Sequence, residues 1–312
     1  MNKTITELFG NHQIRKSKRQ KGAFIEFIKR FAKEKGYSCK IEKGSFGAKN
    51  IVIGKPESAG VVYTAHYDTC AKVPFPNLIT PKNIGLYLLY QLLITAFMLI
   101  PAFAIGFGAW YLLSFTALDA QGAKSVAMLI GYAALLVTLV LMIAGPANKH
   151  TANDNTSGVA TVLTLMDRMP EELRTKAAFI LFDLEEAGLI GSSSYAKAHK
   201  RDMSNTLLIN FDCVSDGKNI LFCAKKKAAL YRREIVEAFE SDGDFNVEFA
   251  EKGFIYPSDQ ASFPVGIGVA ALKKTKSGVL YMDKIHTKND TVFEEKNIEF
   301  LADGAIKLTE IM

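Results

Sequence analysis

The sequence predicts an α/β fold, in which a largely parallel or mixed sheet is covered by helices on both faces and interrupted by a hydrophobic hairpin. Short apolar segments typical of buried strands alternate along the chain with segments of helical periodicity. Polar residues that can bind metal ions follow several of these strands. Between Asn83 and Asn148, only Asp119 and Lys124 carry a charge.

The regular elements follow in order along the chain. An amphipathic helix is expected over Gly22–Gly36, with Phe24, Ile28 and Phe31 on one face. Runs of apolar residues indicate five buried strands, at Val61–Ala65, Ala177–Phe182, Leu207–Phe211, Ile220–Ala224 and Gly268–Leu272. Helical patterns indicate four further helices, at Ser157–Met169, Leu189–Lys200, Ala228–Phe239 and Glu295–Ile311. Helices between consecutive strands are typical of parallel pairing.

Two apolar spans, Ile84–Leu113 and Ser125–Gly145, form the hydrophobic hairpin. Each is long enough to cross a bilayer, which takes about 20 apolar residues, and neither contains a charge. The alternative is a buried hairpin of a soluble protein, whose helices would usually show a polar stripe. We therefore expect a transmembrane hairpin inserted at residues 82–146, so that one main domain is divided into residues 1–81 and 147–312.

Basic residues are concentrated near the N-terminus, although the net charge of the 312 residues is only +6. From Arg15 to Lys35 there are nine Lys or Arg residues and two Glu residues. This segment is either a solvated helix face or a contact with anionic lipid beside the hairpin. A nucleic acid partner is not expected, because no recognition motif accompanies the charge.

The flanking charges and the cysteines predict the side of the membrane on which the main domain lies. Lys82, Lys149 and the basic N-terminal region flank the domain side of the hairpin, and cytoplasmic flanks are enriched in Lys and Arg. The four cysteines show no CxxC pairing, and residues 1–21 contain no apolar core of the signal-peptide type. We expect an integral protein of a bacterial-type plasma membrane, with its main domain in the cytoplasm.

Five short polar islands carry the residue types of a metal site. They are His66 with Asp68, Asp154, Glu185 with Glu186, Asp212, and His286. Three of the islands lie at the carboxyl ends of predicted strands, where open α/β sheets build their sites. Two His and three carboxylates can hold a pair of divalent ions, and nitrogen and oxygen ligands fit zinc, with manganese or cobalt as alternatives.

The adjacent Glu185 and Glu186 predict a hydrolytic site. Neighbouring residues on an irregular segment point in different directions, so one carboxylate can bind metal while the other remains free as a general base. Two metal ions about 3.5–4 Å apart can hold a hydroxide between them and stabilise a hydrolytic transition state. Asp68, two residues after His66, is placed to orient the ring of that His.

Each of these residues also has an ordinary structural explanation. His66 or His286 alone would more often be a structural histidine. Asp154 could cap a helix that starts near Ser157, and the two adjacent Glu residues could lie in a solvated turn. We favour the metal site because the structural explanations would require five separate coincidences, in this order along the chain.

Six motifs together resemble the co-catalytic two-zinc aminopeptidase family: AHYDT, NDNTSGVA, FDLEEAGLIGSSSYA, NFDCVS, YPSDQASF and IHTKNDT. That family includes bacterial leucyl aminopeptidases, glutamate carboxypeptidase, glutaminyl cyclases and transferrin-receptor-type pseudoenzymes. The resemblance covers roughly residues 20–81 and 147–312. It implies a mixed sheet of about eight strands between helices.

The resemblance also implies the roles of individual residues. His66 and Asp212 would bind one zinc ion. Glu186 and His286 would bind the other, and Asp154 would bridge the two.

Three further residues have implied roles outside the ligand set. Glu185 would be the general base and acid, Asp68 would support His66, and Tyr256 lies near the usual position of an oxyanion-stabilising tyrosine. Family members often have Ser-Asp-His where this chain has Ser-Asp-Gln, ending at Gln260.

The resemblance implies a metallo-aminopeptidase that removes N-terminal residues from peptides through a hydroxide held by two zinc ions, with Glu185 as the base. The hairpin, which is a departure from the family, predicts that this enzyme is anchored in a membrane. A carboxypeptidase or another amide hydrolase, and a non-catalytic membrane scaffold, are the alternatives. The hairpin could also form homo-oligomer contacts through Gly106 and Gly108. Because it leaves the domain after His66 and returns before Asp154, both of its roots should lie close to the metal ions, with the active-site face towards the lipid.

Overall fold

In the computed structural model, residues 3–73, 75, 77–241 and 243–312 are described, and within them nine strands form one sheet. Positions 1, 2, 74, 76 and 242 of the expected main domain lie outside this description. Eight strands run in the order β1-β2-β4-β3-β5-β8-β6-β7, and β9 pairs with β8. The strands are β1 (Cys39–Lys43), β2 (Lys49–Ile53), β3 (Val61–His66), β4 (Ala177–Phe182), β5 (Leu207–Phe211), β6 (Asn219–Ala224), β7 (Asn246–Ala250), β8 (Gly266–Lys274) and β9 (Leu280–Tyr281).

The centre of the sheet is parallel and its margins are largely antiparallel. The neighbours β4, β3, β5 and β8 run parallel. Antiparallel pairing joins β1 to β2, β2 to β4, β6 to β8 and β8 to β9, while β6 and β7 are parallel at the far edge. The predicted mixed α/β sheet between helices is confirmed.

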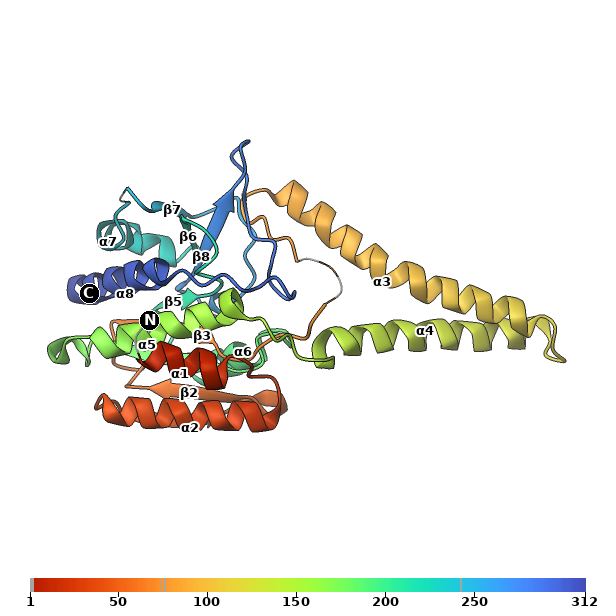
Figure 1. Cartoon of the computed structure of the whole chain (residues 1–312), viewed down its shortest axis with the longest axis horizontal. Coiled ribbons are helices and arrows are strands. Elements are labelled where there is room, and N and C mark those ends of the chain that lie inside the picture. The colour runs from red at the N-terminus through yellow and green to blue at the C-terminus, as the bar shows by residue number, and fades with distance from the viewer. Residues whose placement is uncertain (1–2, 74, 76, 242) are drawn as a thin grey trace.

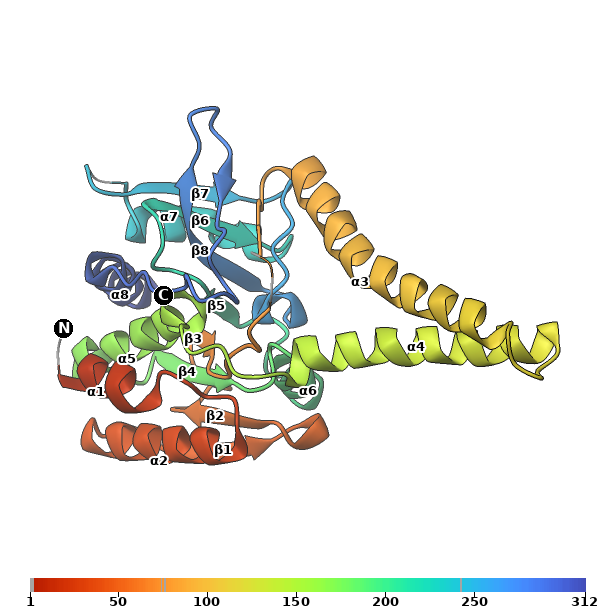
Figure 2. The ribbon, with the colours of Figure 1, turned by 45° about the vertical axis from the view of Figure 1, so that its right-hand side comes forward.

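Helices cover both faces of the sheet (Figures 1 and 2). They are α1 (Lys3–His12), α2 (Lys18–Glu34), α5 (Gly158–Arg168), α6 (Ile190–Ala198), α7 (Arg232–Ala238) and α8 (Glu295–Ile311). Side chains alternate across a strand, so Tyr63 of β3 packs in the core under α1, α2, α5, α7 and α8. Its neighbour Val62 packs on the opposite face with Tyr195 of α6.

The predicted elements agree with the observed ones except at the margins. The bounds of β4 and β5 are those predicted, while α2 begins at Lys18 rather than at Gly22. It begins earlier because Ser17 caps it: the Ser17 hydroxyl accepts a hydrogen bond from the Gln20 amide, and the Gln20 side chain accepts one from the Ser17 amide. The sequence did not predict α1 or the strands β1, β2, β7 and β9. β1 and β7 are partly exposed edge strands with weak apolar patterns, β2 is buried but short and begins with two polar residues, and β9 has only two residues.

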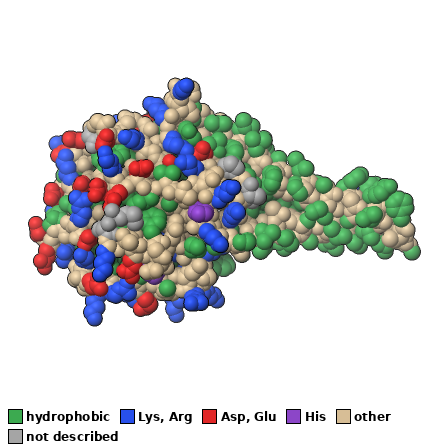
Figure 3. Space-filling view, in the orientation of Figure 1, with side chains coloured by type: hydrophobic (Ala, Val, Ile, Leu, Met, Phe, Trp, Pro, Cys, Tyr) green, Lys and Arg blue, Asp and Glu red, His purple; other side chains and the backbone are tan. Residues whose placement is uncertain are grey.

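A helical hairpin protrudes from the body, formed by α3 (Ile84–Leu113) and α4 (Ala120–Ala144). Both helices are long and apolar enough to cross a membrane, and only 6% of the most apolar window of each is buried. On the face shown in Figure 3, hydrophobic side chains cover much of the hairpin, and several Lys and Arg side chains lie near its base. The second helix begins at Ala120, earlier than predicted, because the Asp119 carboxylate accepts a hydrogen bond from the Gly122 amide.

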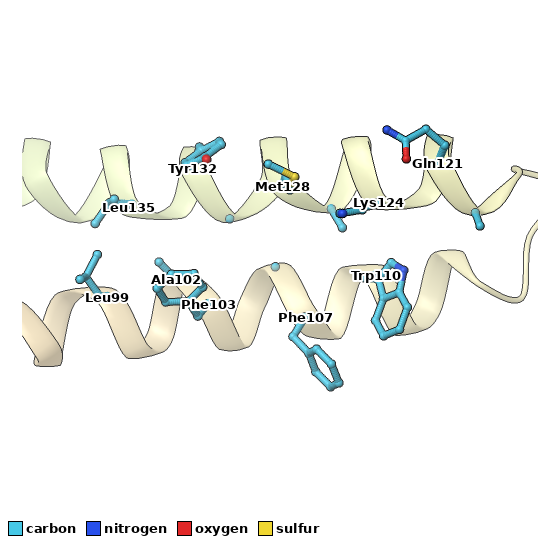
Figure 4. A pocket seen from close by; sticks show the side chains of 14 residues that line it. Leu99, Ala102, Phe103, Phe107, Trp110, Gln121, Lys124, Met128, Tyr132 and Leu135 are labelled. Atoms are coloured by element: carbon cyan, nitrogen blue, oxygen red, sulfur yellow. The ribbon is translucent and has the colours of Figure 1, made fainter.

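Small residues bring the two hairpin helices together. The Cβ that an alanine would place at Gly106 lies 3.4 Å from Cα of Gly131, and Ala102 and Ala127 are buried beside this crossing. Side chains of both helices also line an apolar groove of about 840 Å³, which Figure 4 shows. Gly106 thus contacts its own chain, whereas Gly108 has open space around it.

Candidate metal centre

The candidate site lies at the carboxyl ends of the central parallel strands. His66 is the last residue of β3 and is paired with Phe182, the last residue of β4. Asp212 follows β5, and Glu185 follows β4 by a short turn. Parallel strands direct their carboxyl ends to one edge, so the structure brings together side chains that are far apart in sequence.

One group of three ligand atoms surrounds His66. Its Nε2 atom lies 3.4 Å from Oδ1 of Asp154 and 3.5 Å from Oδ1 of Asp212. All three residues are buried, and their potential ligand atoms lie within 4.8 Å of one another. These are the residues for which the resemblance implies one ion and the bridging carboxylate.

A second group lies on the other side of Asp154. The Asp154 Oδ2 atom is 2.9 Å from Nε2 of His286, and the same nitrogen is 3.2 Å from Oε2 of Glu186. The two oxygens of Asp154 therefore face two different histidines. This is the arrangement required of a carboxylate that bridges two ions.

The protonation of these groups reflects burial among like charges. Burial and the neighbouring Glu186 raise the pKa of the Glu185 carboxyl well above its usual range. Burial lowers the pKa of His66, but the charge of Glu185 and hydrogen bonding to Asp154 outweigh it and raise that pKa well above the usual value. Burial likewise opposes ionisation of Asp154, but its hydrogen bonds to His286 and His66 hold its pKa below the usual range. The buried site therefore favours cationic groups close to its carboxylates.

Asp68 connects the ends of β3 and β4. Its Oδ1 atom accepts a hydrogen bond of 3.0 Å from the Glu185 amide, and Oδ2 accepts one of 3.3 Å from the Glu186 amide. Its backbone carbonyl oxygen lies 3.1 Å from Nδ1 of His66, and its Oδ1 atom lies 3.7 Å from the same nitrogen. Asp68 thus touches both His66 and the turn that presents the two glutamates.

The backbone is unusual beside three of the islands. Leu184, Cys213 and His286 have positive φ angles of 56°, 55° and 61°, in the left-handed region that non-glycine residues rarely adopt. Leu184 directly precedes Glu185, and Cys213 directly follows Asp212. Such conformations persist where the surrounding contacts hold them, often at functional sites.

The loop that presents Asp154 is held by residues to which the sequence analysis assigned no role. Asp290 accepts hydrogen bonds from the amides of Asn153 and Asp154, at 2.8 and 3.0 Å. The Asn153 carboxamide oxygen accepts another from the Ser215 amide, at 2.8 Å. The signal was present, because Asn153 and Asp290 lie within the quoted motifs NDNTSGVA and IHTKNDT.

Arg15 is a second supporting residue that the sequence analysis did not identify. Arg15 belongs to the basic segment for which the sequence predicts a solvated helix face or a lipid contact, but its side chain is fully buried. Its guanidinium donates hydrogen bonds to the carbonyl oxygen of Tyr67 and to the hydroxyl of Thr156. Burial lowers the pKa of Arg15 to about 10, although the negative charges of Asp68 and Asp154 act in the other direction and raise it. It remains a cation behind the site.

Tyr256 and Gln260 lie beside the site in a buried network. The Tyr256 hydroxyl donates a hydrogen bond of 2.8 Å to the backbone carbonyl oxygen of Asp212. The Gln260 amide donates one of 2.8 Å to the Tyr256 carbonyl oxygen and accepts one from Asn210. In this arrangement Tyr256 supports the backbone of Asp212, and the buried Gln260 side chain links Tyr256 to Asn210.

A cleft of about 610 Å³ joins the site to the end of α4. Asp68 and Glu186 line it from the site, and Ile143 and Gly145 line it from the hairpin. Lys16 also lines this cleft and donates a hydrogen bond of 2.6 Å to the Ile143 carbonyl oxygen. The end of the second helix therefore forms a wall of the cleft beside the candidate site.

The two roots of the hairpin separate after leaving the site. Residues 70–73 lie against residues 146–148: the Lys72 amide donates to the Pro146 carbonyl oxygen, and the Asn148 amide donates to that of Cys70. Just before α3, Lys82 forms an ion pair with Glu248 of β7, the strand at the far edge of the sheet. The prediction that both roots of the hairpin lie at the site thus fits the root at α4. It does not fit the other root, because α3 begins beside β7 (Figure 2).

Comparison with known proteins identifies the family. The sequence profile of peptidase family M28 matches residues 137–306, which is more than half of the chain. The chain belongs to peptidase family M28. The matched segment contains Asp154, Glu185, Glu186, Asp212 and His286, while His66 precedes it. A comparison with curated proteins gave no match.

Solved structures share the fold of this M28 peptidase. The LapA aminopeptidase of Legionella pneumophila superimposes with a TM-score of 0.53 at 14% identity, covering 98% of this chain and 69% of LapA. PhTET1-12s, whose structure has a dodecamer in the asymmetric unit, gives a TM-score of 0.51 at 13% identity over 99% of both chains. A glutaminyl cyclase of Porphyromonas gingivalis gives 0.48 at 14% identity, over 99% of this chain and 94% of that one. At these identities the likeness to LapA and to PhTET1-12s concerns the fold alone.

Proposed function

We propose that this M28 peptidase is a membrane-anchored, two-zinc aminopeptidase that releases N-terminal residues from peptides. The observation that carries the proposal is the division of Asp154 between the two histidines, with one oxygen facing His66 and the other facing His286. Two further findings support it: the chain belongs to a peptidase family, and it shares its fold with the LapA aminopeptidase. Manganese or cobalt could replace zinc at ligands of this type.

The geometry of the donor atoms fits bound metal. Ligand atoms bound tetrahedrally about 2.0–2.1 Å from zinc lie about 3.4 Å from one another, and the two distances from His66 Nε2 are 3.4 and 3.5 Å. Buried Glu186 Oε1 also has no hydrogen-bond partner among the described residues. His66 and Asp212 would hold one ion, and Glu186 and His286 would hold the other. Asp154 would bind both ions.

The residues of the chain divide the catalytic work. Bound metal ions would supply Lewis acidity, which activates water and stabilises negative charge on the scissile carbonyl. Glu185, whose pKa is raised by burial, would accept the proton of the attacking water and pass it to the leaving amine. Asp68 would hold the Glu185 turn and the His66 ring in place. Tyr256 would stabilise the oxyanion of the substrate. To do so, its hydroxyl would release the Asp212 carbonyl oxygen and donate its hydrogen bond to the substrate.

The hairpin would anchor residues 1–81 and 147–312, as one catalytic domain, to the plasma membrane. Its exposed apolar surface supports this role, and the flanking Lys82 and Lys149 favour a cytoplasmic domain. Since Ile143 of α4 lines the active-site cleft, the site would face the lipid surface. Extraction of membranes with alkaline carbonate tests the anchor, because an integral protein stays in the pellet and a peripheral one is released.

The decisive test of the activity is the Glu185→Gln variant, purified in detergent beside the wild type and a surface control, Glu172→Gln. We expect metal analysis to find two ions per chain in all three proteins. Turnover of peptides with a free N-terminus should fall by at least about 100-fold in Glu185→Gln alone, because the general base is lost. Unchanged turnover in this variant would contradict the assigned mechanism.

The same panel separates the alternatives. Peptides with free and blocked N-termini and with free C-termini distinguish an aminopeptidase from a carboxypeptidase or another amide hydrolase. A preference for blocked N-termini would exclude the aminopeptidase. A wild-type protein that binds no metal and cleaves no peptide would instead support a membrane scaffold.

A further inference from the structure

A free thiol lies beside the second half of the site, where the proposed mechanism does not use it. Cys70 is 2% exposed and follows the AHYDT motif directly. Its Sγ atom forms a group with one ligand atom each of Glu186 and His286, in which all three lie within 4.8 Å of one another. The sequence predicts only nitrogen and oxygen ligands, so this thiol has no role in the predicted site.

The backbone around this thiol is held at the site. The Cys70 carbonyl oxygen accepts a hydrogen bond from the Asn148 amide, and the next residue bridges to Ala147 on the returning chain. The preceding Thr69 hydroxyl accepts a hydrogen bond from the Arg15 amide. Contacts on both sides therefore keep the thiol beside the two proposed ligands.

An unsatisfied oxygen points to a ligand in the same place. Glu186 Oε1 is buried without a hydrogen-bond partner among the described residues, while its Oε2 atom faces His286. A buried carboxylate oxygen that lacks a donor normally has an ion or a water as its partner. An ion that binds Glu186 and His286 would also lie within reach of Cys70.

We propose that Cys70 supplies a thiolate to the metal ion held by Glu186 and His286, which gives this half of the site a mixed nitrogen, oxygen and sulfur donor set. The proposal rests on the metal site proposed above and adds a ligand to it. On binding, the thiol releases its proton to solvent as the sulfur–metal bond forms. A thiolate favours zinc, cobalt or cadmium over manganese and magnesium, which prefer oxygen ligands.

The other buried cysteine near the site has a different environment. Cys213 Sγ lies 3.2 Å from Oδ1 of Asp212, to which it donates a hydrogen bond. It forms no group of three potential ligands among the described residues. Cys213 is therefore expected to remain a thiol, and Cys39, half-buried on the edge strand β1, provides a matched control away from the site.

Cobalt substitution of the full-length protein in detergent tests the proposal. The metal-free protein is titrated with Co²⁺, and we expect a near-ultraviolet thiolate-to-cobalt charge-transfer band to develop with the binding of one ion per chain. The band should disappear in Cys70→Ser and Cys70→Ala and persist in Cys39→Ser. Zinc affinity should fall by at least about tenfold in the two Cys70 variants.

A second measurement on the wild type does not depend on folding of a variant. The protein is alkylated with and without Zn²⁺, and the modified cysteines are located by mass spectrometry. Zinc should protect Cys70, and released thiol protons should appear in a weakly buffered titration. Binding of two cobalt ions without a charge-transfer band, or zinc without protection of Cys70, would overturn this proposal and leave the oxygen and nitrogen site intact. Absence of metal binding would overturn both.

Discussion

The Glu185 amide donates a hydrogen bond of 3.0 Å to Oδ1 of Asp68. Asp68 therefore positions the proposed general base directly, in addition to its predicted role in orienting His66. Its contact with the His66 ring is made more closely by its backbone carbonyl oxygen, at 3.1 Å, than by its carboxylate, at 3.7 Å. One short segment after β3 thus holds both a proposed ligand and the base.

Replacement of Asp68 by Ala should therefore damage the turn that carries Glu185 more than the orientation of the His66 ring. Two backbone amides would lose their acceptor, so we expect kcat to fall by about 10- to 100-fold with a smaller change in metal content. Steady-state kinetics and metal analysis on the purified protein measure the two effects. Wild-type kcat in Asp68→Ala would show that the carboxylate does not position Glu185.

Replacement of Asp290 by Ala should weaken metal binding without removing a ligand. The amides of Asn153 and Asp154 would lose their acceptor, so the loop that presents Asp154 would loosen. We expect metal affinity to fall by about 10- to 100-fold, measured by competition with a chelating dye. Asp303→Ala is the control, because Asp303 forms only an exposed ion pair with Arg168. Equal affinities in the two variants would contradict the supporting role of Asp290.

Replacement of Arg15 by Leu should lower the stability of the folded domain. The Tyr67 carbonyl oxygen would be left buried without this donor, at a cost of about 1–3 kcal/mol in the free energy of unfolding. The exposed Arg19 of the same segment provides the control, Arg19→Leu, which should be neutral. Denaturant titration of the two variants in detergent measures the difference, and an unchanged midpoint for Arg15→Leu would refute the prediction.

Two neighbouring glycines of α3 offer a matched test of the hairpin packing. A leucine at Gly106 would collide with Gly131 and the Ala127 carbonyl oxygen of α4, whereas a leucine at Gly108 has open space. We expect Gly106→Leu to separate the helices and Gly108→Leu to leave them in contact. Distances between spin labels on α3 and α4 report the separation. The same distance in both variants would show that this crossing does not depend on small residues.

Removal of metal should destabilise the protein, because buried carboxylates would lose the cations that compensate their charge. A ligand present at 100 times its Kd stabilises the folded state by about 2.7 kcal/mol per site. The thermal midpoint in detergent should therefore fall with a chelator and recover with Zn²⁺. Asp154→Asn, which lacks the bridging charge, should respond less. A midpoint that does not respond to a chelator would argue against tightly bound ions.

The helices and central strands were predictable because their patterns are local. Runs of buried apolar residues located β4 and β5 with their observed bounds, and the absence of charge located α3. The edge strand β1 and helix α1 have weaker patterns, since partial exposure permits polar residues. The start of α4 was misplaced because its first turn contains Gln121 and Lys124, and the Asp119 cap was not recognised.

The sequence by itself determined the class of the site, because the residue types and their order in the chain indicate metal-dependent hydrolysis without any distance. Only the tertiary structure showed that Asp154 faces two histidines, that Arg15 is buried behind the site and that Cys70 lies beside Glu186. It also placed the end of α4, and not the start of α3, at the cleft beside the candidate metal site. These relationships join residues far apart in the chain, and they depend on how strands and loops pack, which no local pattern records.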